Sequence, residues 1–271
     1  HRCTQLGAAL AFYGIFSFPP LLLLIASVFG YVLASWAGAA AFKDSLAELI
    51  SNAVSPQVSR IATEAVAATE DARSRLGLIG LGTGALAALA HPEQRLVFFE
   101  IDPLSEAMAR DHFTYLADTP AEVEVIIDDG RLALDDVPDA SMDLLVVDAF
   151  NSDSVPTHLL TVEALRLYLA KLQPAGLVAF HISNRYLDLE PVIAGITSAV
   201  GAPAALADFA PTDDERADGA SASIVAAVSA DAGTIARLPG GGGYWRAVAG
   251  DRAVVWTDDH VNLVPTLGHS H

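Results

Sequence analysis

Cysteine and basic residues are scarce in this 271-residue sequence. Cys3 is the only cysteine, which excludes internal disulfides and zinc or iron–sulfur sites built from cysteines. A single cysteine also fits an intracellular catalytic part. Only 15 Lys and Arg residues stand against 33 Asp and Glu residues, so the formal net charge is −18. This charge opposes attraction to a phosphate backbone, so we expect no nucleic-acid partner and favour a small cationic substrate.

Charged residues are missing altogether between Arg2 and Lys43. The run 6–42 is apolar almost throughout and is longer than the roughly 20 residues that cross a bilayer core. We therefore predict an apolar membrane-type helix within residues 1–42, with a Pro-Pro pair that kinks it or makes part of it re-entrant. A buried helix of a large soluble protein is the alternative. Residues 43–75 have apolar positions at helical spacing, which predicts an amphipathic helical linker.

The N-terminal run has a recognisable sequence, A-A-L-A-F-Y-G-I-F-S-F-P-P-L-L-L-L-I-A at residues 8–26. It resembles the first membrane helix of the YihY/BrkB family of bacterial membrane proteins, and the similarity continues to about residue 70. The resemblance implies association with the bacterial inner membrane through residues 6–42. It carries over no catalytic residue.

From residue 76 onward, short β-rich runs alternate with helical stretches, a pattern typical of βαβ units and a parallel sheet. We predict one Rossmann-like α/β domain over 76–271, with a seven-stranded, mostly parallel sheet and helices on both faces. An exposed loop is predicted at 208–219 and a glycine turn at 239–243. The predicted strands cover residues 76–80, 95–101, 123–127, 143–148, 176–182, 223–229 and 253–256.

The first predicted strand ends in a glycine-rich turn formed by Gly80, Gly82 and Gly84, and a helical run follows directly. Glycine lets the backbone turn sharply, so a cofactor can approach the start of that helix. With Ala85 the turn also satisfies the G-x-G-x-x-G/A dinucleotide pattern. Glu100 ends the second strand roughly 20 residues later, where an acidic side chain accepts hydrogen bonds from ribose hydroxyls. The spacing predicts a nucleoside site but does not separate a nicotinamide cofactor from a sulfonium one.

Acidic residues also follow the next strands. Asp102 precedes a proline and is interpreted as the N-cap of a helix. Asp129 follows the third strand, where an acid can accept the exocyclic amine of adenine, whereas Asp128 beside it is interpreted as part of a solvated turn. Asp148 ends the fourth strand, so we expect it to face the reacting end of the cofactor and to bind and deprotonate an ammonium group. A loop-capping aspartate is the alternative for Asp148.

Five other polar residues stand out less. His181 follows the fifth strand, and we weigh a pocket-lining role against a structural one. Asp258 and Asp259 either add negative potential near a cationic substrate or form an ordinary turn. His269 and His271 resemble part of a tail, and we expect no metal site in this protein.

Together these motifs resemble the spermidine synthase family, especially the bacterial spermidine synthase-like domains that are fused to membrane segments. The resemblance implies decarboxylated S-adenosylmethionine as aminopropyl donor, a diamine such as putrescine as acceptor, and 5′-methylthioadenosine as by-product. It assigns the ribose to Glu100, the adenine to Asp129 and deprotonation of the amine to Asp148. The matching segments lie between residues 76 and 267 and read G-L-G-T-G, F-F-E-I-D-P, D-D-G-R, V-V-D-A-F-N-S-D-S-V-P-T-H-L-L-T, A-F-H-I-S-N-R-Y-L and W-T-D-D-H-V-N-L.

The sequence departs from that family in two places. Aminopropyltransferases carry a D-S-S-D-P-like loop, whereas here the second acid, Asp153, lies further from Asp148 and is the candidate for binding the amine. Membrane-type sequence also replaces the N-terminal β-hairpin domain.

These departures leave other functions open. One is a methyltransferase that uses ordinary S-adenosylmethionine, and another is a non-catalytic, membrane-tethered nucleoside-binding module. A nicotinamide dehydrogenase explains the acids at the third and fourth strand ends poorly. We expect a cytoplasmic catalytic domain, with a homodimer as one expected assembly.

Overall fold

The computed structural model describes residues 74–82, 84–149, 155–184, 186–210, 212–213, 222–238 and 245–267. The predicted membrane-type helix (1–42), almost all of the predicted linker (43–75) and Asp153 lie outside these ranges. Among the described residues, no helix combines the length and apolarity needed to cross a bilayer.

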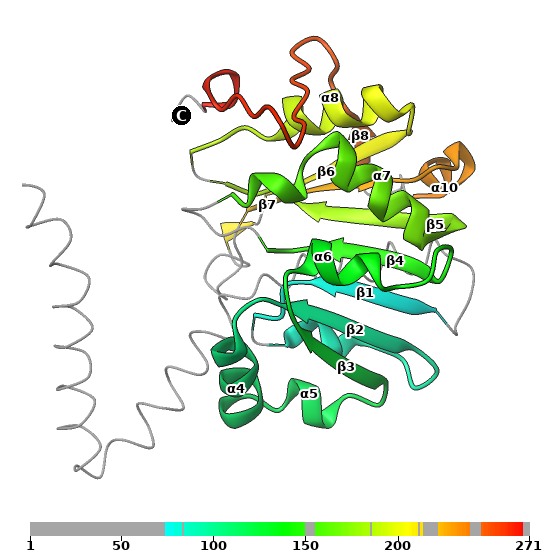
Figure 1. Ribbon diagram of the computed structural model, residues 1–271, viewed down its shortest axis with the longest axis vertical. Coiled ribbons are helices and arrows are strands. Elements are labelled where there is room, and N and C mark those ends of the chain that lie inside the picture. Colours follow the sequence, from blue (N-terminus) through cyan, green and yellow to red (C-terminus); the bar gives the residue numbers. More distant parts are fainter. Residues whose placement is uncertain are drawn as a thin grey trace, which may run out of the picture. The chain divides into compact units, whose positions relative to one another are not determined.

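The described residues form one mixed eight-stranded sheet, shown in Figure 1, whose strand order is β3-β2-β1-β4-β5-β7-β6-β8. The first five strands are parallel, and β7 is antiparallel to both β5 and β6. The strands are β1 (Arg75–Ile79), β2 (Arg95–Glu100), β3 (Glu122–Ile127), β4 (Met142–Val147), β5 (Leu172–His181), β6 (Ala204–Phe209), β7 (Ser223–Val228) and β8 (Trp245–Ala247).

Helical segments connect the strands and cover the sheet. The α-helices are α4 (Pro103–His112), α5 (Tyr115–Asp118), α6 (Gly130–Asp135), α7 (Val162–Lys171), α8 (Glu190–Val200) and α10 (Ala232–Arg237). The 3₁₀ helices are η1 (Ala85–Leu89), η2 (Thr157–Leu159) and η4 (Val264–Thr266). The run after the glycine turn is therefore a short 3₁₀ helix.

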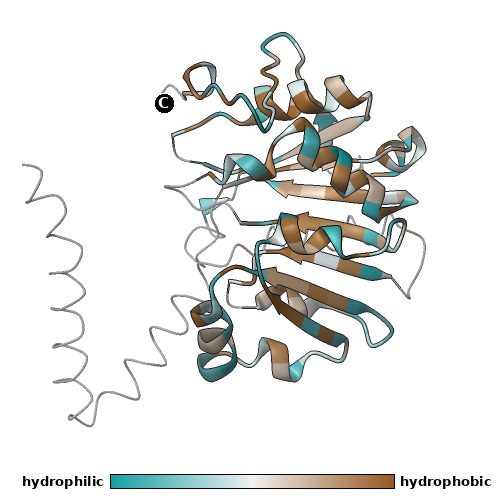
Figure 2. Cartoon of the chain, viewed as in Figure 1, coloured by the Kyte–Doolittle hydropathy of each residue, from teal (hydrophilic) through white to brown (hydrophobic). Residues whose placement is uncertain are grey.

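Two hydrophobic clusters lie on the two faces of the sheet, as the alternation of a strand requires. In β4, Leu145 and Val147 pack with α7 and α8, whereas Leu144 and Val146 pack in the cluster that contains residues of η1 and α4. Burying such a side chain fully contributes about 1.5–3 kcal/mol. Figure 2 shows the hydrophobic residues concentrated along these central strands. The predicted α/β class with helices on both faces is confirmed.

The predicted number and identity of the strands need correction. The sheet has eight strands, of which β6 and β8 were not predicted, and the predicted loop at 208–219 begins within β6. The predicted strand at 253–256 is wrong, because this extended segment pairs with the starts of two helices. Val254 N donates to Pro191 O in α8 at 2.8 Å, and Trp256 O accepts from Val162 N in α7 at 3.0 Å.

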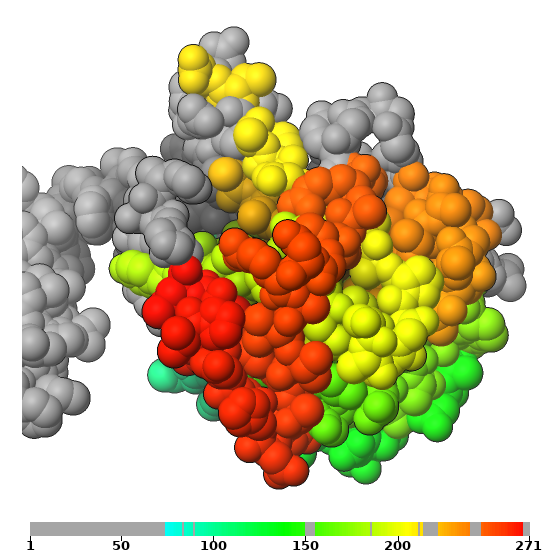
Figure 3. Space-filling model, turned by 90° about the horizontal axis from the view of Figure 1, so that it is seen from above, coloured from blue at the N-terminus to red at the C-terminus, as the bar shows by residue number. Residues whose placement is uncertain are grey.

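The C-terminal segment lies against the start of α8. Asp188 N donates to Thr266 O at 2.7 Å, and Arg252 forms an ion pair with Asp188 at 2.8 Å. Figure 3 shows the C-terminal residues, orange to red, on this surface beside residues near position 200 in yellow. The segment thereby brings the W-T-D-D-H motif close to helices that follow β3 and β4.

Candidate functional site

A cavity of about 400 Å³ opens at the carboxyl ends of β1, β2 and β4 and the start of α6. This volume is typical of small-molecule sites, and the carboxyl edge is where open α/β sheets bind ligands. Apart from Gly84, the lining includes every described residue that was predicted to bind the nucleoside or to act in catalysis, namely Gly80, Gly82, Glu100, Asp129 and Asp148. Residues up to 68 positions apart, Gly80 and Asp148, therefore line one cavity, as expected at the carboxyl ends of parallel strands.

The glycine turn brings the backbone of β1 against the end of β4. Gly80 has a φ of 100°, and a Cβ there would lie 2.5 Å from the carbonyl oxygen of Asp148. Only glycine fits this conformation and this contact. Gly82 (φ 54°) lines the cavity with open space around it, whereas Gly84 packs on Leu116 and does not line it. Gly84 therefore has a packing role in the structure.

Glu100 is a buried carboxylate, only 8% exposed. Its Oε2 accepts a hydrogen bond from Leu81 N at 2.9 Å, and its Oε1 accepts one from Asp102 N at 3.0 Å. Each carboxylate oxygen has a further lone pair, so both oxygens can also accept a hydroxyl hydrogen. The geometry is that of a pre-oriented acceptor for a diol.

Asp129 has two neighbours of different kinds. Its Oδ1 caps α6 by accepting from Arg131 N at 2.9 Å and Leu132 N at 3.1 Å. Its Oδ2 lies 3.2 Å from Nε2 of His158, a cavity-lining residue on η2 that sequence reasoning missed. Asp128 is exposed, and its Oδ1 accepts a hydrogen bond from the neighbouring Asp129 N at 2.7 Å, as expected for a turn residue.

Asp102 caps α4 as predicted. Its Oδ1 accepts from Leu104 N at 2.9 Å, and Pro103 occupies the first position of the helix. Asp102 does not line the cavity. The capping interpretation of this acid is therefore confirmed.

Asp148 lies one residue beyond β4, with its side chain 30% exposed. Its Oδ1 is 2.7 Å from Nδ1 of His181, and Nε2 of His181 is 2.9 Å from Oγ of Ser183. Sequence reasoning left His181 between two roles, and the structure places it in direct contact with the predicted catalytic acid. The strand register explains this contact. Val147 of β4 pairs with Phe180 of β5, so the residues that follow them, Asp148 and His181, lie side by side.

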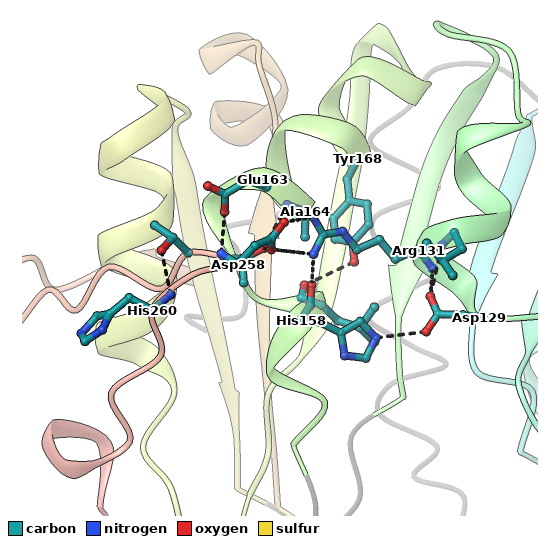
Figure 4. Close-up of polar contacts among 12 residues, drawn as sticks. Asp129, Arg131, His158, Glu163, Ala164, Tyr168, Asp258 and His260 are labelled. Carbon is teal, nitrogen blue, oxygen red and sulfur yellow. Dashed lines mark hydrogen bonds and ion pairs between the residues drawn. The ribbon is translucent and has the colours of Figure 1, made fainter.

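A second polar network lies beside η2, whose residues His158 and Leu159 line the cavity, and Figure 4 shows its contacts. The guanidinium of Arg131 binds both carboxylate oxygens of Asp258, at 2.7 and 2.6 Å, and donates to the carbonyl oxygen of His158 at 2.8 Å. Thr161 Oγ1 donates to Asp258 at 2.8 Å, and Glu163 accepts from Asp258 N at 3.1 Å.

The Arg131–Asp258 pair has electrostatic consequences. The hydrogen bonds from Arg131 hold the pKa of Asp258 below its usual value, and the same pair raises the pKa of Arg131. The charge of Asp258 is thus paired with an arginine, and Asp258 does not line the cavity. Of the two interpretations of this acid, the structure favours a turn residue that ties the C-terminal segment to α6.

The cavity is electronegative. Its lining contains three carboxylates, those of Glu100, Asp129 and Asp148, and no Lys or Arg among the described residues. Arg131 is near in sequence to Asp129, but its guanidinium is bound to Asp258. A cationic ligand is therefore electrostatically favoured over an anionic one.

Comparison with known proteins finds different matches for the N-terminal and the C-terminal parts of the chain. The family model described as virulence factor BrkB matches residues 1–94, so the match continues past the expected end near residue 70 into β1 and η1. It covers about a third of the sequence, in agreement with the N-terminal resemblance. None of the curated proteins matches the chain.

Solved structures are similar in fold to the C-terminal part of the chain. A probable spermidine synthase from Corynebacterium glutamicum ATCC 13032 aligns with a TM-score of 0.54 and 19% identity over 81% of each chain. Spermidine synthase from Thermotoga maritima aligns at 0.48 and 16% identity, over 63% of this chain and 58% of that one. Human methyltransferase-like protein 13 in complex with SAH aligns at 0.48 and 16%, over 64% and 82%. The first of these shows that the chain shares the fold of that probable spermidine synthase.

Proposed function

We propose that the cavity binds an S-adenosylmethionine-type nucleoside and that the protein transfers an aminopropyl group from decarboxylated S-adenosylmethionine to a diamine such as putrescine. The observation that carries the proposal is the convergence of Glu100, Asp129 and Asp148 with the glycine turn on one cavity. Fold similarity to a probable spermidine synthase supports the same choice.

The donor would bind along the carboxyl edge of the sheet. Glu100 presents two oxygens, already fixed by backbone N–H groups, to the ribose hydroxyls. Asp129 would accept a hydrogen bond from the exocyclic amine of adenine, and the side chain of His158 beside it would reorient around the nucleoside. Adenine beyond β3 and ribose beyond β2 would direct the sulfonium across β1 toward Asp148, which follows β4.

The reaction then needs one proton acceptor and no metal step. The amine loses a proton to the carboxylate of Asp148, because an ammonium nitrogen has no lone pair to donate. The free lone pair attacks the carbon attached to sulfur in line with the leaving group. A C–N bond forms, the C–S bond breaks with its electron pair passing to sulfur, and neutral 5′-methylthioadenosine leaves. Binding both reactants in this geometry supplies much of the rate.

The lining also bears on which donor is used. Ordinary S-adenosylmethionine carries a carboxylate, which three neighbouring carboxylates disfavour and which no lysine or arginine among the described lining residues would pair. Decarboxylated donor lacks that group and carries only positive charge. The cavity therefore favours aminopropyl transfer over methyl transfer.

The test is a transfer assay with the purified full-length chain in detergent. Putrescine and longer diamines are incubated with each donor in turn, and spermidine-type and methylated products are separated by mass. Aminopropylated product with decarboxylated donor supports the proposal. Methylated product with ordinary donor would establish the methyltransferase, and nucleoside binding without either product would establish the binding module.

We also propose that residues 6–42 attach the protein to the bacterial inner membrane with the catalytic domain in the cytoplasm, as the BrkB match at residues 1–94 supports. So long an uncharged run is costly to solvate. Fractionation without detergent should place the full-length chain with membranes. Recovery of monodisperse full-length protein in the soluble fraction would contradict this proposal.

A further inference from the structure

Three strands of the sheet contribute to a chain of hydrogen bonds that ends on Asp148. Oδ1 of Asp148, after β4, is 2.7 Å from Nδ1 of His181, the last residue of β5. Nε2 of His181 is 2.9 Å from Oγ of Ser183, and this oxygen accepts the backbone N–H of Ile224 in β7 at 2.7 Å. The anchor is therefore a backbone group of the sheet itself.

The donors in this chain can be assigned. An ionised carboxylate only accepts hydrogen bonds, so Nδ1 of His181 must carry the hydrogen shared with Asp148. Nε2 of the neutral ring is then an acceptor, and the hydroxyl of Ser183 donates to it. The hydroxyl oxygen still accepts from Ile224 N. Both ring nitrogens of His181 and the hydroxyl of Ser183 have a partner in this one tautomer, which holds the ring in place.

The same three residue types form the triad of serine hydrolases, so a nucleophilic Ser183 has to be considered. The hydrogen bond from Ile224 N engages a lone pair of Oγ and makes it a weaker nucleophile. Ser183 and His181 also do not line the cavity among the described residues, whereas Asp148 does. The reacting end of this chain is the carboxylate.

We propose that His181 is a positioning residue for the acid that activates the amine, an inference that rests on the proposed aminopropyl transfer. The Nδ1–H group holds Oδ1 of Asp148, and Oδ2, which has no bond among the described residues, is left to take the proton of the amine. Ser183 holds the ring, and the backbone of β7 holds Ser183. The hydrogen bond from His181 to Oδ1 thus orients the carboxylate so that Oδ2 faces the acceptor amine.

Two substitutions of His181 separate positioning from proton relay. Asn carries an amide nitrogen at the same number of bonds from Cα as Nδ1, so His181→Asn keeps a donor for Asp148. His181→Gln places its amide near the former Nε2, so it keeps a partner for Ser183 but loses the donor. We expect kcat to fall roughly 10²-fold in H181Q, as for a misplaced group, and to stay within about tenfold of the parent in H181N.

Nucleoside binding and a remote histidine provide the controls. The Kd for methylthioadenosine should change less than about twofold in both variants, a factor worth about 0.4 kcal/mol. His91→Gln, an exposed site before β2, should leave kcat unchanged. An equal loss of kcat in H181N and H181Q would overturn positioning, and so would labelling of Ser183 by a fluorophosphonate probe.

A measurement on the parent protein keeps this inference distinct from the proposed function. In ¹⁵N-histidine-labelled full-length protein, His181, assigned by its absence from the H181N spectrum, should be the Nδ1–H tautomer. An Nε2–H tautomer would overturn the inference whatever the activity. The Nδ1–H tautomer in a parent that transfers nothing would contradict the aminopropyltransferase and leave the Asp148–His181 bond supported.

Discussion

Replacing Glu100 by Gln tests the nucleoside site most sharply, because the carboxylate is buried and both of its oxygens are engaged. Leu81 N binds Oε2 at 2.9 Å and Asp102 N binds Oε1 at 3.0 Å. Glutamine has one oxygen, so one of the two backbone N–H groups would face an amide NH₂. A buried donor left without a partner costs about 1–3 kcal/mol. We expect the free energy of unfolding of the ligand-free protein to fall by that amount.

The same change weakens binding of the ribose. A charge-assisted hydrogen bond contributes about 1.5–3 kcal/mol, and the amide can offer at most one neutral acceptor. The loss of one such bond raises Kd by at least about tenfold, since 1.4 kcal/mol is one decade. Calorimetric titration with methylthioadenosine measures the change in Kd, and urea unfolding without ligand measures the change in the free energy of unfolding.

Glu124→Gln is the matched control. Glu124 lies on β3 with its side chain 44% exposed and pairs with Arg95 at the surface. Exposed pairs contribute little to stability, and this residue does not line the cavity. Unchanged affinity in E100Q, or an equal decrease in E124Q, would refute the assignment of the ribose to Glu100.

Substitutions at three other acids, Asp148, Asp129 and Asp258, give further tests. Asp148→Asn should lower turnover by roughly 10²–10⁴ while methylthioadenosine binds as in the parent, with Asp128→Asn as the neutral control; retained turnover would remove Asp148 from the mechanism. Asp129→Asn keeps an oxygen to cap α6 and should lower mainly nucleoside affinity, whereas Asp129→Ala should also lose about 0.5–2 kcal/mol of stability in thermal unfolding. Full affinity in the Asn variant would place adenine elsewhere. Arg131 holds the pKa of Asp258 below the usual 3.8, so this ion pair stabilises the fold above that pH and the contribution is lost as pH falls through the lowered value. Asp258→Asn should therefore show a flatter loss of stability below about pH 4 in urea unfolding; an unaltered acid profile would mean that the pair contributes nothing.

Errors in the predicted sheet have local causes. Ala204–Phe209 forms β6 although its sequence, A-A-L-A-D-F, is rich in alanine and has little β character. Three-residue β8 is too short for any periodic signal. The segment 253–256 contains β-branched and aromatic residues, yet it lies along α8, where Gly195 leaves room for the backbone of Val254. Only Trp256 of this segment is buried, and backbone hydrogen bonds to the starts of α7 and α8 take the place of pairing with a strand.

The sequence by itself determined the α/β class, the turn at Gly80 and the strand-end positions of Glu100, Asp129 and Asp148. These are local properties: alternation sets the strands, and the carboxyl ends of parallel strands gather at one edge. Only the tertiary structure decided which side chains meet there. His181 reaches Asp148 across 33 positions and Arg131 reaches Asp258 across 127. Such contacts depend on strand order and on where the C-terminal segment packs, and neither is encoded in the spacing of residues along the chain.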